Sequence, residues 1–272
     1  MHRTFLSVAL FVGLASTATA QWPSRPTPGL PRTPDGRPDL AAPAPRTSRG
    51  TPDLSGLWAS EPDPRGKPEG VENTVFPRYL MNVMQDVKDA GALLTPAAAQ
   101  LYRDRLANDS VDDPIAHCQP PGSPRIFSFG RPTKIIDTPG LVVLLHEQDT
   151  SFRQIFTDGR PLPLLEDVFP TWMGYSVGAW DHDTFVVTTM GLTDRSWLDV
   201  TGHPHTEALT MVERFRRLDM GHLAIEVTYT DPGTFRTPLT IRQQLRLLPD
   251  SEIIESFCTD NEKDRSHYVA TN

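Results

Sequence analysis

Apolar and polar residues alternate through the C-terminal half of the chain. One segment carries Leu223, Ile225, Val227 and Tyr229 at every second position, and the next repeats the pattern with Leu239, Ile241, Leu245 and Leu247. Successive side chains of a strand point to opposite faces, so this alternation predicts strands with one dry and one wet face. That pattern is typical of antiparallel sheets buried on a single side.

Short turn segments separate the apolar runs from residue 125 onward and predict a series of hairpins. The expected strands cover residues 134–137, 141–147, 152–157, 173–180, 184–190, 207–218, 222–230, 237–248 and 252–257. We therefore expect a mainly β fold, an antiparallel meander that coils into an up-and-down barrel or half-barrel. A two-sheet sandwich is the alternative.

One or two helices are expected before these strands. Thr95 and Pro96 form a helix start, with a capping hydroxyl followed by proline at the first helical position. Leu101, Tyr102 and Leu106 would share one face of this helix with Ala98. A shorter helix is expected over residues 78–90, ending at Gly91. Both should pack on the outside or at the end of the sheet.

The N-terminus has the pattern of a cleavable signal peptide over residues 1–20. Arg3 supplies a positive charge, residues 5–15 form a short apolar run, and Ala18-Thr19-Ala20 is a small-x-small cleavage site. The run is shorter than the roughly 20 residues that a membrane-spanning helix needs. An N-terminal anchor is the alternative. We expect a periplasmic or secreted protein with no membrane span.

Residues 21–52 contain nine prolines and almost no large apolar side chains. Such a stretch buries too little surface to offset its ordering entropy, so we expect a disordered, extended leader. Residues 53–272 should then form a single β-rich domain.

The charge of the chain argues against nucleic acid as a partner. The net charge is −8, and cleavage after residue 20 would remove Arg3 and make it −9. Lys and Arg are scattered, so the basic patch that a nucleic acid or an anionic membrane surface would need is missing.

The two cysteines, Cys118 and Cys258, are expected to form a disulfide, because an exported protein folds in an oxidising compartment. The alternative is a reactive thiol at Cys118, where the adjacent His117 would be the group that lowers the thiol pKa.

Polar residues interrupt the face that should be dry. Glu213 falls among Leu209, Met211 and Phe215, and Gln243 falls between Ile241 and Leu245. A carboxylate on an apolar face must find a partner or undergo a rise in pKa, and both outcomes are common at functional sites. The alternative is a structural ion pair of Glu213 with Arg153, Arg214 or another arginine.

A second candidate is the run from Gly202 to Glu207. In an extended chain His203, His205 and Glu207 would project to one side, a geometry able to hold a divalent metal, with His146 as a conceivable fourth ligand. Without metal, His205 and Glu207 could act as a general acid/base pair. A loop with incidental histidines is the alternative.

The connection that precedes this run carries Asp194, Trp197 and Asp199 and is a candidate lid over a barrel mouth. A surface loop with Trp197 packed into the core is the alternative. The usual hydrolase elbow, phosphate loop and zinc-protease motifs are absent from the sequence.

Several runs are similar to a known group of proteins. They include residues 170–187 (PTWMGYSVGAWDHDTFVV), 157–160 (TDGR), 197–199 (WLD), 204–207 (PHTE) and 213–217 (ERFRR). Over roughly residues 53–264 the chain resembles exported, uncharacterised proteins of environmental Gram-negative bacteria. The resemblance implies a β-rich fold of lipocalin-like appearance and no particular activity.

Three functions remain open at this point. The first is an exported small-molecule binding or carrier protein with a barrel pocket, for which we expect ligand contacts from Trp172, Tyr175, Trp197, Asp199 and Gln243. The second is a periplasmic enzyme with acid/base or hydrolytic chemistry, metal-assisted or not, carried by His205, Glu207, Glu213 and Arg214. The third is a structural envelope protein.

Overall fold

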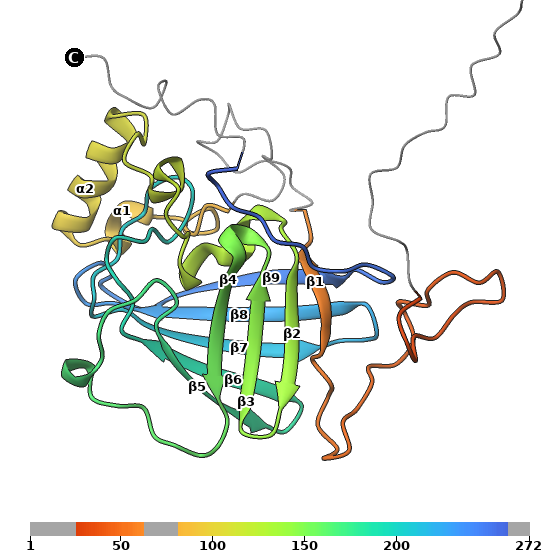
Figure 1. The fold of residues 1–272 in the computed structure, drawn as a ribbon. Helices are drawn as coiled ribbons and strands as arrows, with labels where there is room; N and C mark the ends of the chain where they lie inside the picture. Colours follow the sequence, from red (N-terminus) through yellow and green to blue (C-terminus); the bar gives the residue numbers. More distant parts are fainter. Residues whose placement is uncertain (1–25, 63–80, 261–272) are drawn as a thin grey trace, which may run out of the picture.

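The computed structural model describes residues 26–62 and 81–260, which form one closed, mainly β barrel (Figure 1). Its strands are β1 (Gly56–Ser60), β2 (Thr133–Thr138), β3 (Leu141–His146), β4 (Ser151–Phe156), β5 (Tyr175–Asp181), β6 (Thr184–Met190), β7 (Thr210–Arg217), β8 (His222–Thr230) and β9 (Leu239–Leu247). Each pairs with its neighbours in sequence, and β1 pairs with β9 to close the barrel. The predicted β-barrel is confirmed, and the sandwich is not formed.

The alternation read from the sequence places the core as expected. All four apolar residues predicted to share a face in β8, from Leu223 to Tyr229, are buried. The β7–β8 register pairs Glu213 with Val227 and Phe215 with Ile225, so Glu213 faces the interior. The side-chain period of two therefore determines which residues of these strands line the barrel.

One junction departs from the expected meander. β4 and β5 run parallel and share only two register pairs, Ile155 with Ser176 and Phe156 with Val177; we call this junction the β4–β5 seam. Every other neighbouring pair in the barrel is antiparallel. Parallel neighbours need a long connection, and residues 157–174 supply it. The seam is thus the junction of the barrel with the fewest paired residues.

The last expected strand, over residues 252–257, does not form. Its place beside β9 is taken by β1, whose Trp58 and Ser60 pair with Leu247 and Leu245. The chain instead runs on to Cys258, whose disulfide with Cys118 confirms the pairing predicted from the sequence.

The helical region is only partly as predicted. α2 (Pro96–Ala107) begins as expected, because the Thr95 hydroxyl caps the N–H of Ala98. Leu101 and Leu106, however, are both 43% exposed, so the expected apolar face of α2 is largely uncovered.

The prediction of a helix over residues 78–90 is wrong for residues 81–89, and residues 78–80 lie outside the described residues. Turns lead there into the single-turn helix α1 (Ala90–Leu93). The side chains of Asn82 and Asp89 accept backbone N–H groups of Met84 and Ala92, a local bonding that competes with a longer helix.

Short 3₁₀ helices complete the fold: η1 (Pro114–His117), η2 (Ser123–Phe129), η3 (Gln148–Thr150) and η4 (Leu165–Asp167). η2 lies across one end of the barrel. The Tyr229 hydroxyl donates to the Pro124 carbonyl at 2.9 Å, and the ring of Phe127 meets that of His146 edge-on. Through these two contacts η2 connects β8 with β3 at this end of the barrel. The helices α1 and α2 lie near the same end (Figure 1).

Residues 26–52 do not behave as the disordered leader that their composition predicts. Two turns, closed by bridges between Arg32 and Pro38 and between Arg46 and Pro52, satisfy their backbone groups locally. Arg32 pairs with Asp250, and Arg46 pairs with Asp183. These contacts attach the segment to the barrel, although the segment has little apolar surface of its own. The expected signal peptide, residues 1–20, lies outside the described residues.

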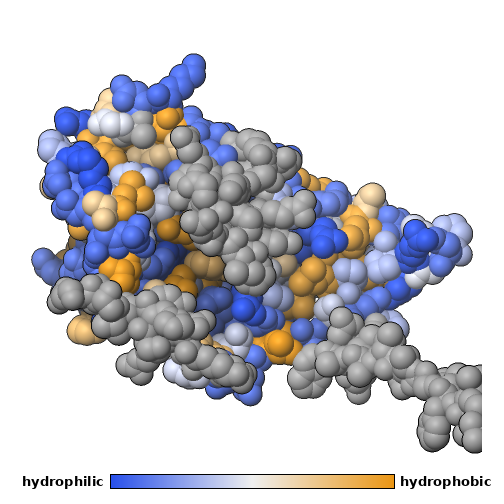
Figure 2. All heavy atoms as spheres, turned by 90° about the horizontal axis from the view of Figure 1, so that it is seen from above, coloured by the Kyte–Doolittle hydropathy of each residue, from blue (hydrophilic) through white to orange (hydrophobic). Residues whose placement is uncertain are grey.

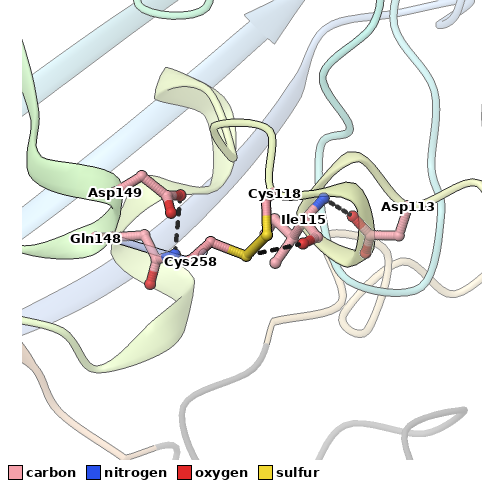
Figure 3. The surroundings of a disulfide bond; sticks show 6 residues. All are labelled: Asp113, Ile115, Cys118, Gln148, Asp149 and Cys258. Atoms are coloured by element: carbon pink, nitrogen blue, oxygen red, sulfur yellow. Dashed lines mark hydrogen bonds between the residues drawn. A yellow bond between two sulfur atoms is a disulfide. The ribbon is translucent and has the colours of Figure 1, made fainter. Parts of the chain in front are cut away.

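The disulfide joins the segment after η1 to the C-terminal segment (Figure 3). Near it, Asp113 caps η1 by accepting the N–H of Ile115 at 2.9 Å. Within residues 26–62 and 81–260, no helix is long and apolar enough to cross a membrane.

Replacement of both Cys118 and Cys258 by serine should lower the free energy of unfolding by up to about 5 kcal/mol, because the bond closes a loop with a sequence separation of 140. Urea unfolding measures this loss. Reduced wild-type protein is the matched control and should unfold at the same urea concentration as the double variant. An unchanged midpoint in both would contradict the expectation.

Candidate functional site

The buried polar group expected from the sequence is an ion pair inside the barrel. Glu213 on β7 is 1% exposed and receives both terminal nitrogens of Arg153 on β4, with Nη1 to Oε1 at 3.0 Å and Nη2 bonded to Oε2. The sequence left open whether Glu213 is a functional carboxylate or part of a structural ion pair, and the arrangement is that of the ion pair.

Arg153 also reaches across the β4–β5 seam. Its Nε donates to Ser176 Oγ on β5 at 3.1 Å, and Nη2 donates to Thr189 Oγ1 on β6 at 2.7 Å. The two hydroxyls lie 2.9 Å apart. One guanidinium thus joins β4, β5, β6 and β7, where the backbone ladder itself contributes only two register pairs. A buried pair survives when its remaining donors are satisfied in this way.

Most side chains that face the barrel interior have almost no accessible surface. Val187, Leu223 and Leu245 are all 0% exposed, and Arg153 is 1% exposed. A side chain without accessible surface borders no space large enough for a water molecule. Glu213 is itself 1% exposed among these side chains, which leaves no room beside its carboxylate for a substrate and argues against Glu213 as a catalytic group.

Two further polar groups face inward with an unpaired atom. His146 Nδ1 lies 2.9 Å from Thr133 Oγ1, while its Nε2 has no partner. Burial, aided by the charge of Arg153, lowers the pKa of His146 to about 3, so the ring is neutral. Gln243 is half-buried, with Nε2 3.0 Å from the sulfur of Met81 and Oε1 unpaired.

Other candidates lie outside the barrel. Arg214 is exposed on the outer face of β7, opposite Glu226. Tyr175 packs on Phe156 with ring centroids 5.2 Å apart. Trp172 is half-buried beneath Arg195, whose guanidinium carbon lies 4.9 Å from the ring centroid. Arg214 and Tyr175 therefore do not share a site with Glu213.

The connection from Gly191 to His205 is built around Asp199. Its carboxylate accepts the N–H of Val83 at 2.8 Å, the N–H of Gly202 at 3.1 Å and Nδ1 of His203 at 2.7 Å. Burial alone would raise the pKa of Asp199, but the charge and hydrogen bonds of His203 and the backbone N–H donors lower it below its ordinary value. Asp199 is thus a buried anion that holds the loop, and Trp197 is buried as the alternative reading required.

The two histidines of this loop point to different partners. The His203 ring stacks on Tyr102 of α2 at 4.0 Å. His205 Nε2 lies 2.7 Å from Ser196 Oγ, and its Nδ1 lies 2.9 Å from the Thr206 carbonyl, so Nδ1 carries the proton and Nε2 accepts from serine. Burial lowers the pKa of His205.

Ser196 and His205 have the contacts of a nucleophile and its base, but access is lacking. Ser196 is 0% exposed, and Gly122 packs so closely that a Cβ added there would lie 2.7 Å from Ser196 Cβ. A substrate carbonyl has no path to the hydroxyl in this arrangement. The pair therefore fastens the loop.

The expected metal set is not assembled. Glu207 is exposed in a turn, because Asp231 binds both the N–H and the hydroxyl of Thr206 and delays β7 until Thr210. His203 and His205 are committed to Asp199 and Ser196. Within the part of the chain that the structure describes, no group of three or more His, Cys, Asp or Glu residues could hold a metal ion. The acid/base pair of His205 and Glu207 is not formed either.

An open cleft of about 480 Å³, here called the rim cleft, lies between α2, η1 and the Gly191–His205 connection. It is lined by Leu101, Asp104, Arg105, Asn108, Asp112, Pro114, His117, Gln119, Arg195 and Trp197. Seen from above, hydrophilic and hydrophobic residues are interspersed over this end of the molecule (Figure 2). Of the ligand-binding residues expected from the sequence, Trp197 alone lines this cleft.

The chain matches no family model, no curated protein and no solved structure. The resemblance to exported lipocalin-like proteins therefore stays a prediction, and the geometry alone indicates where a ligand could bind.

Sequence reasoning missed the helix side of the rim cleft. Arg105 lies on α2 and Arg195 two residues before Trp197, at positions where arginine usually only decorates a surface. The sequence indicated these two arginines only indirectly, because both belong to polar segments that also contain apolar residues. Only the fold brings α2 beside the loop and places both arginines at one cleft.

Replacement of Glu213 by leucine should lower the free energy of unfolding by about 3–5 kcal/mol, because Arg153 would remain buried without its counter-ion. The double variant Arg153→Met, Glu213→Leu should lose much less than the sum of the single variants. Thermal or urea unfolding measures both. The exposed pair Arg242–Glu226 is the matched control, and Arg242→Met should change little. Additive losses in the double variant would contradict the role of the pair.

His146 should make stability depend on pH between about 6.5 and 3. Its pKa in the folded state, about 3, lies below the ordinary histidine value of 6.5, so the unfolded chain binds an extra proton in this window. The contribution of His146 is complete above pH 6.5 and is lost as pH falls toward 3. The free energy of unfolding of His146→Gln should therefore fall less steeply than that of the wild type. Parallel pH profiles would refute this assignment.

Proposed function

We propose that the protein is an exported small-molecule binding protein whose ligand occupies the rim cleft. The observation that carries this proposal is the 480 Å³ cleft itself, within the range of 300–1,000 Å³ typical of small-molecule sites. The barrel interior supports it, because most of the described inward side chains are buried and leave little space for the expected barrel pocket.

The construction of the cleft also fits a binding role. One wall is a regular helix, α2, and the opposite wall is a loop held by the Asp199 carboxylate and the Ser196–His205 bond. The disulfide fixes the segment that contributes His117 and Gln119. A wall held at several points loses little conformational entropy when a ligand binds, which favours affinity.

Export is the second part of the proposal. The N-terminal pattern supports it, and so does the disulfide, because such bonds persist mainly in the periplasm and outside cells. A lipocalin-like relationship would agree with the barrel, although barrels of that kind hold their ligand in the interior, whereas the ligand proposed here lies on the rim.

Leu101→Trp tests the location of the site, because Leu101 lines the cleft and is 43% exposed, so that a larger side chain fills the cleft without entering the core. Leu106→Trp is the matched control: it lies on the same helix with the same exposed fraction and does not line the cleft. A fragment library screened by saturation-transfer NMR should give ligands whose dissociation constants rise at least about tenfold in Leu101→Trp, about 1.4 kcal/mol.

The same ligands should bind Leu106→Trp as they bind the wild type. Ligands that bind all three proteins equally would place the site elsewhere, and the absence of any ligand would contradict a binding function.

A further inference from the structure

Two of the cations that line the rim cleft lack an anionic partner. Arg105 Nη1 donates to the Gly202 carbonyl at 2.9 Å, and Arg195 Nη2 donates to Gln119 Oε1 at 3.0 Å. Both acceptors are neutral. Among the described residues neither arginine forms an ion pair, in contrast to the buried Arg125 and Arg153, which pair with Asp113 and Glu213.

The carboxylates near the cleft already have partners. Asp104 accepts the Gln100 amide at 2.7 Å, and Asp112 lies 3.4 Å from the Asn108 amide. Asp113 is bound to Arg125. Deeper in the loop, Asp199 is committed to His203 and backbone donors. These acids lower the potential around the arginines but leave guanidinium N–H groups of Arg105 and Arg195 available.

Both guanidiniums are also held in place by aromatic rings. The Arg105 carbon lies 4.5 Å from the centroid of Trp197, and the Arg195 carbon lies 4.9 Å from that of Trp172. Stacking fixes the plane of a guanidinium and so orients its free donors. Burial, with the charge of Arg125, lowers the pKa of Arg105 to about 10, and the charges of Asp113, Asp112 and Asp199 only partly oppose this shift.

We infer that the rim cleft takes a small organic anion, whose acidic group is bound by Arg105 and Arg195 and whose apolar body lies against Leu101. The planar donors of arginine suit a carboxylate or a similar acidic group. Leu101 and Pro114 supply apolar surface on the helix and η1 sides of the cleft. This inference rests on the proposed function and specifies its class of ligand.

Isothermal titration calorimetry of the full mature chain with phenylacetate tests the inference, with the neutral isostere phenylacetamide and inorganic phosphate as comparison probes. Phenylacetate should bind at least about tenfold more tightly than either, and its affinity should fall as salt is raised. Arg195→Gln and Arg105→Gln should each weaken phenylacetate binding about tenfold. Arg195 is exposed, so its variant should fold even if Arg105→Gln does not.

Arg103→Gln is the matched control, because Arg103 is an exposed arginine of α2 that does not line the cleft, and its variant should bind as the wild type does. Equal binding of phenylacetamide and phenylacetate, both sensitive to Leu101→Trp, would overturn the inference and leave the proposed function standing. Phosphate binding as tight as phenylacetate binding would overturn the requirement for an apolar body. No binding of phenylacetate would overturn the inference, and the fragment screen alone would then decide the proposed function.

Discussion

The barrel depends on one buried guanidinium. Arg153 bonds to residues of β5, β6 and β7 at the junction where β4 and β5 share only two backbone register pairs. Glu213 supplies the counter-charge, and the hydroxyls of Ser176 and Thr189 satisfy further donors. An ion pair in this setting does not need to add net stability to matter. Replacement of only one partner would leave the other as an uncompensated buried charge. The two residues therefore act together to fix how the sheet closes.

This closure has consequences for where function can lie. Because large side chains and the Arg153 network occupy most of the interior, the proposed ligand site lies in the chain outside the barrel. α2, η1 and the Gly191–His205 connection enclose the rim cleft there. The buried Asp199 and the disulfide hold two of these walls. Hydrogen bonds and a covalent bond therefore stabilise the structure at the rim, whereas apolar packing stabilises most of the barrel.

Local pattern predicted the strands well, because the alternation of side chains in β8 reports directly on burial. It also placed Glu213 inside. It could not supply Arg153 as the partner with certainty, since the two are 60 positions apart and meet only through the parallel β4–β5 seam. Glu207 was misplaced because a turn held by Asp231 interrupts the expected strand. The rim cleft was missed because its arginines are far apart in the sequence and come together only when α2 packs beside a distant loop.

Most inward side chains of the barrel are buried, and we propose that ligands bind outside it. Methyl NMR spectra recorded under xenon pressure test this most directly, because xenon enters dry apolar cavities in proteins. A filled barrel should show no saturable xenon-induced shifts at the interior methyl groups of Val187, Leu223 and Ile225. Saturable shifts that cluster at those methyl groups would reveal a hollow barrel and would contradict the account.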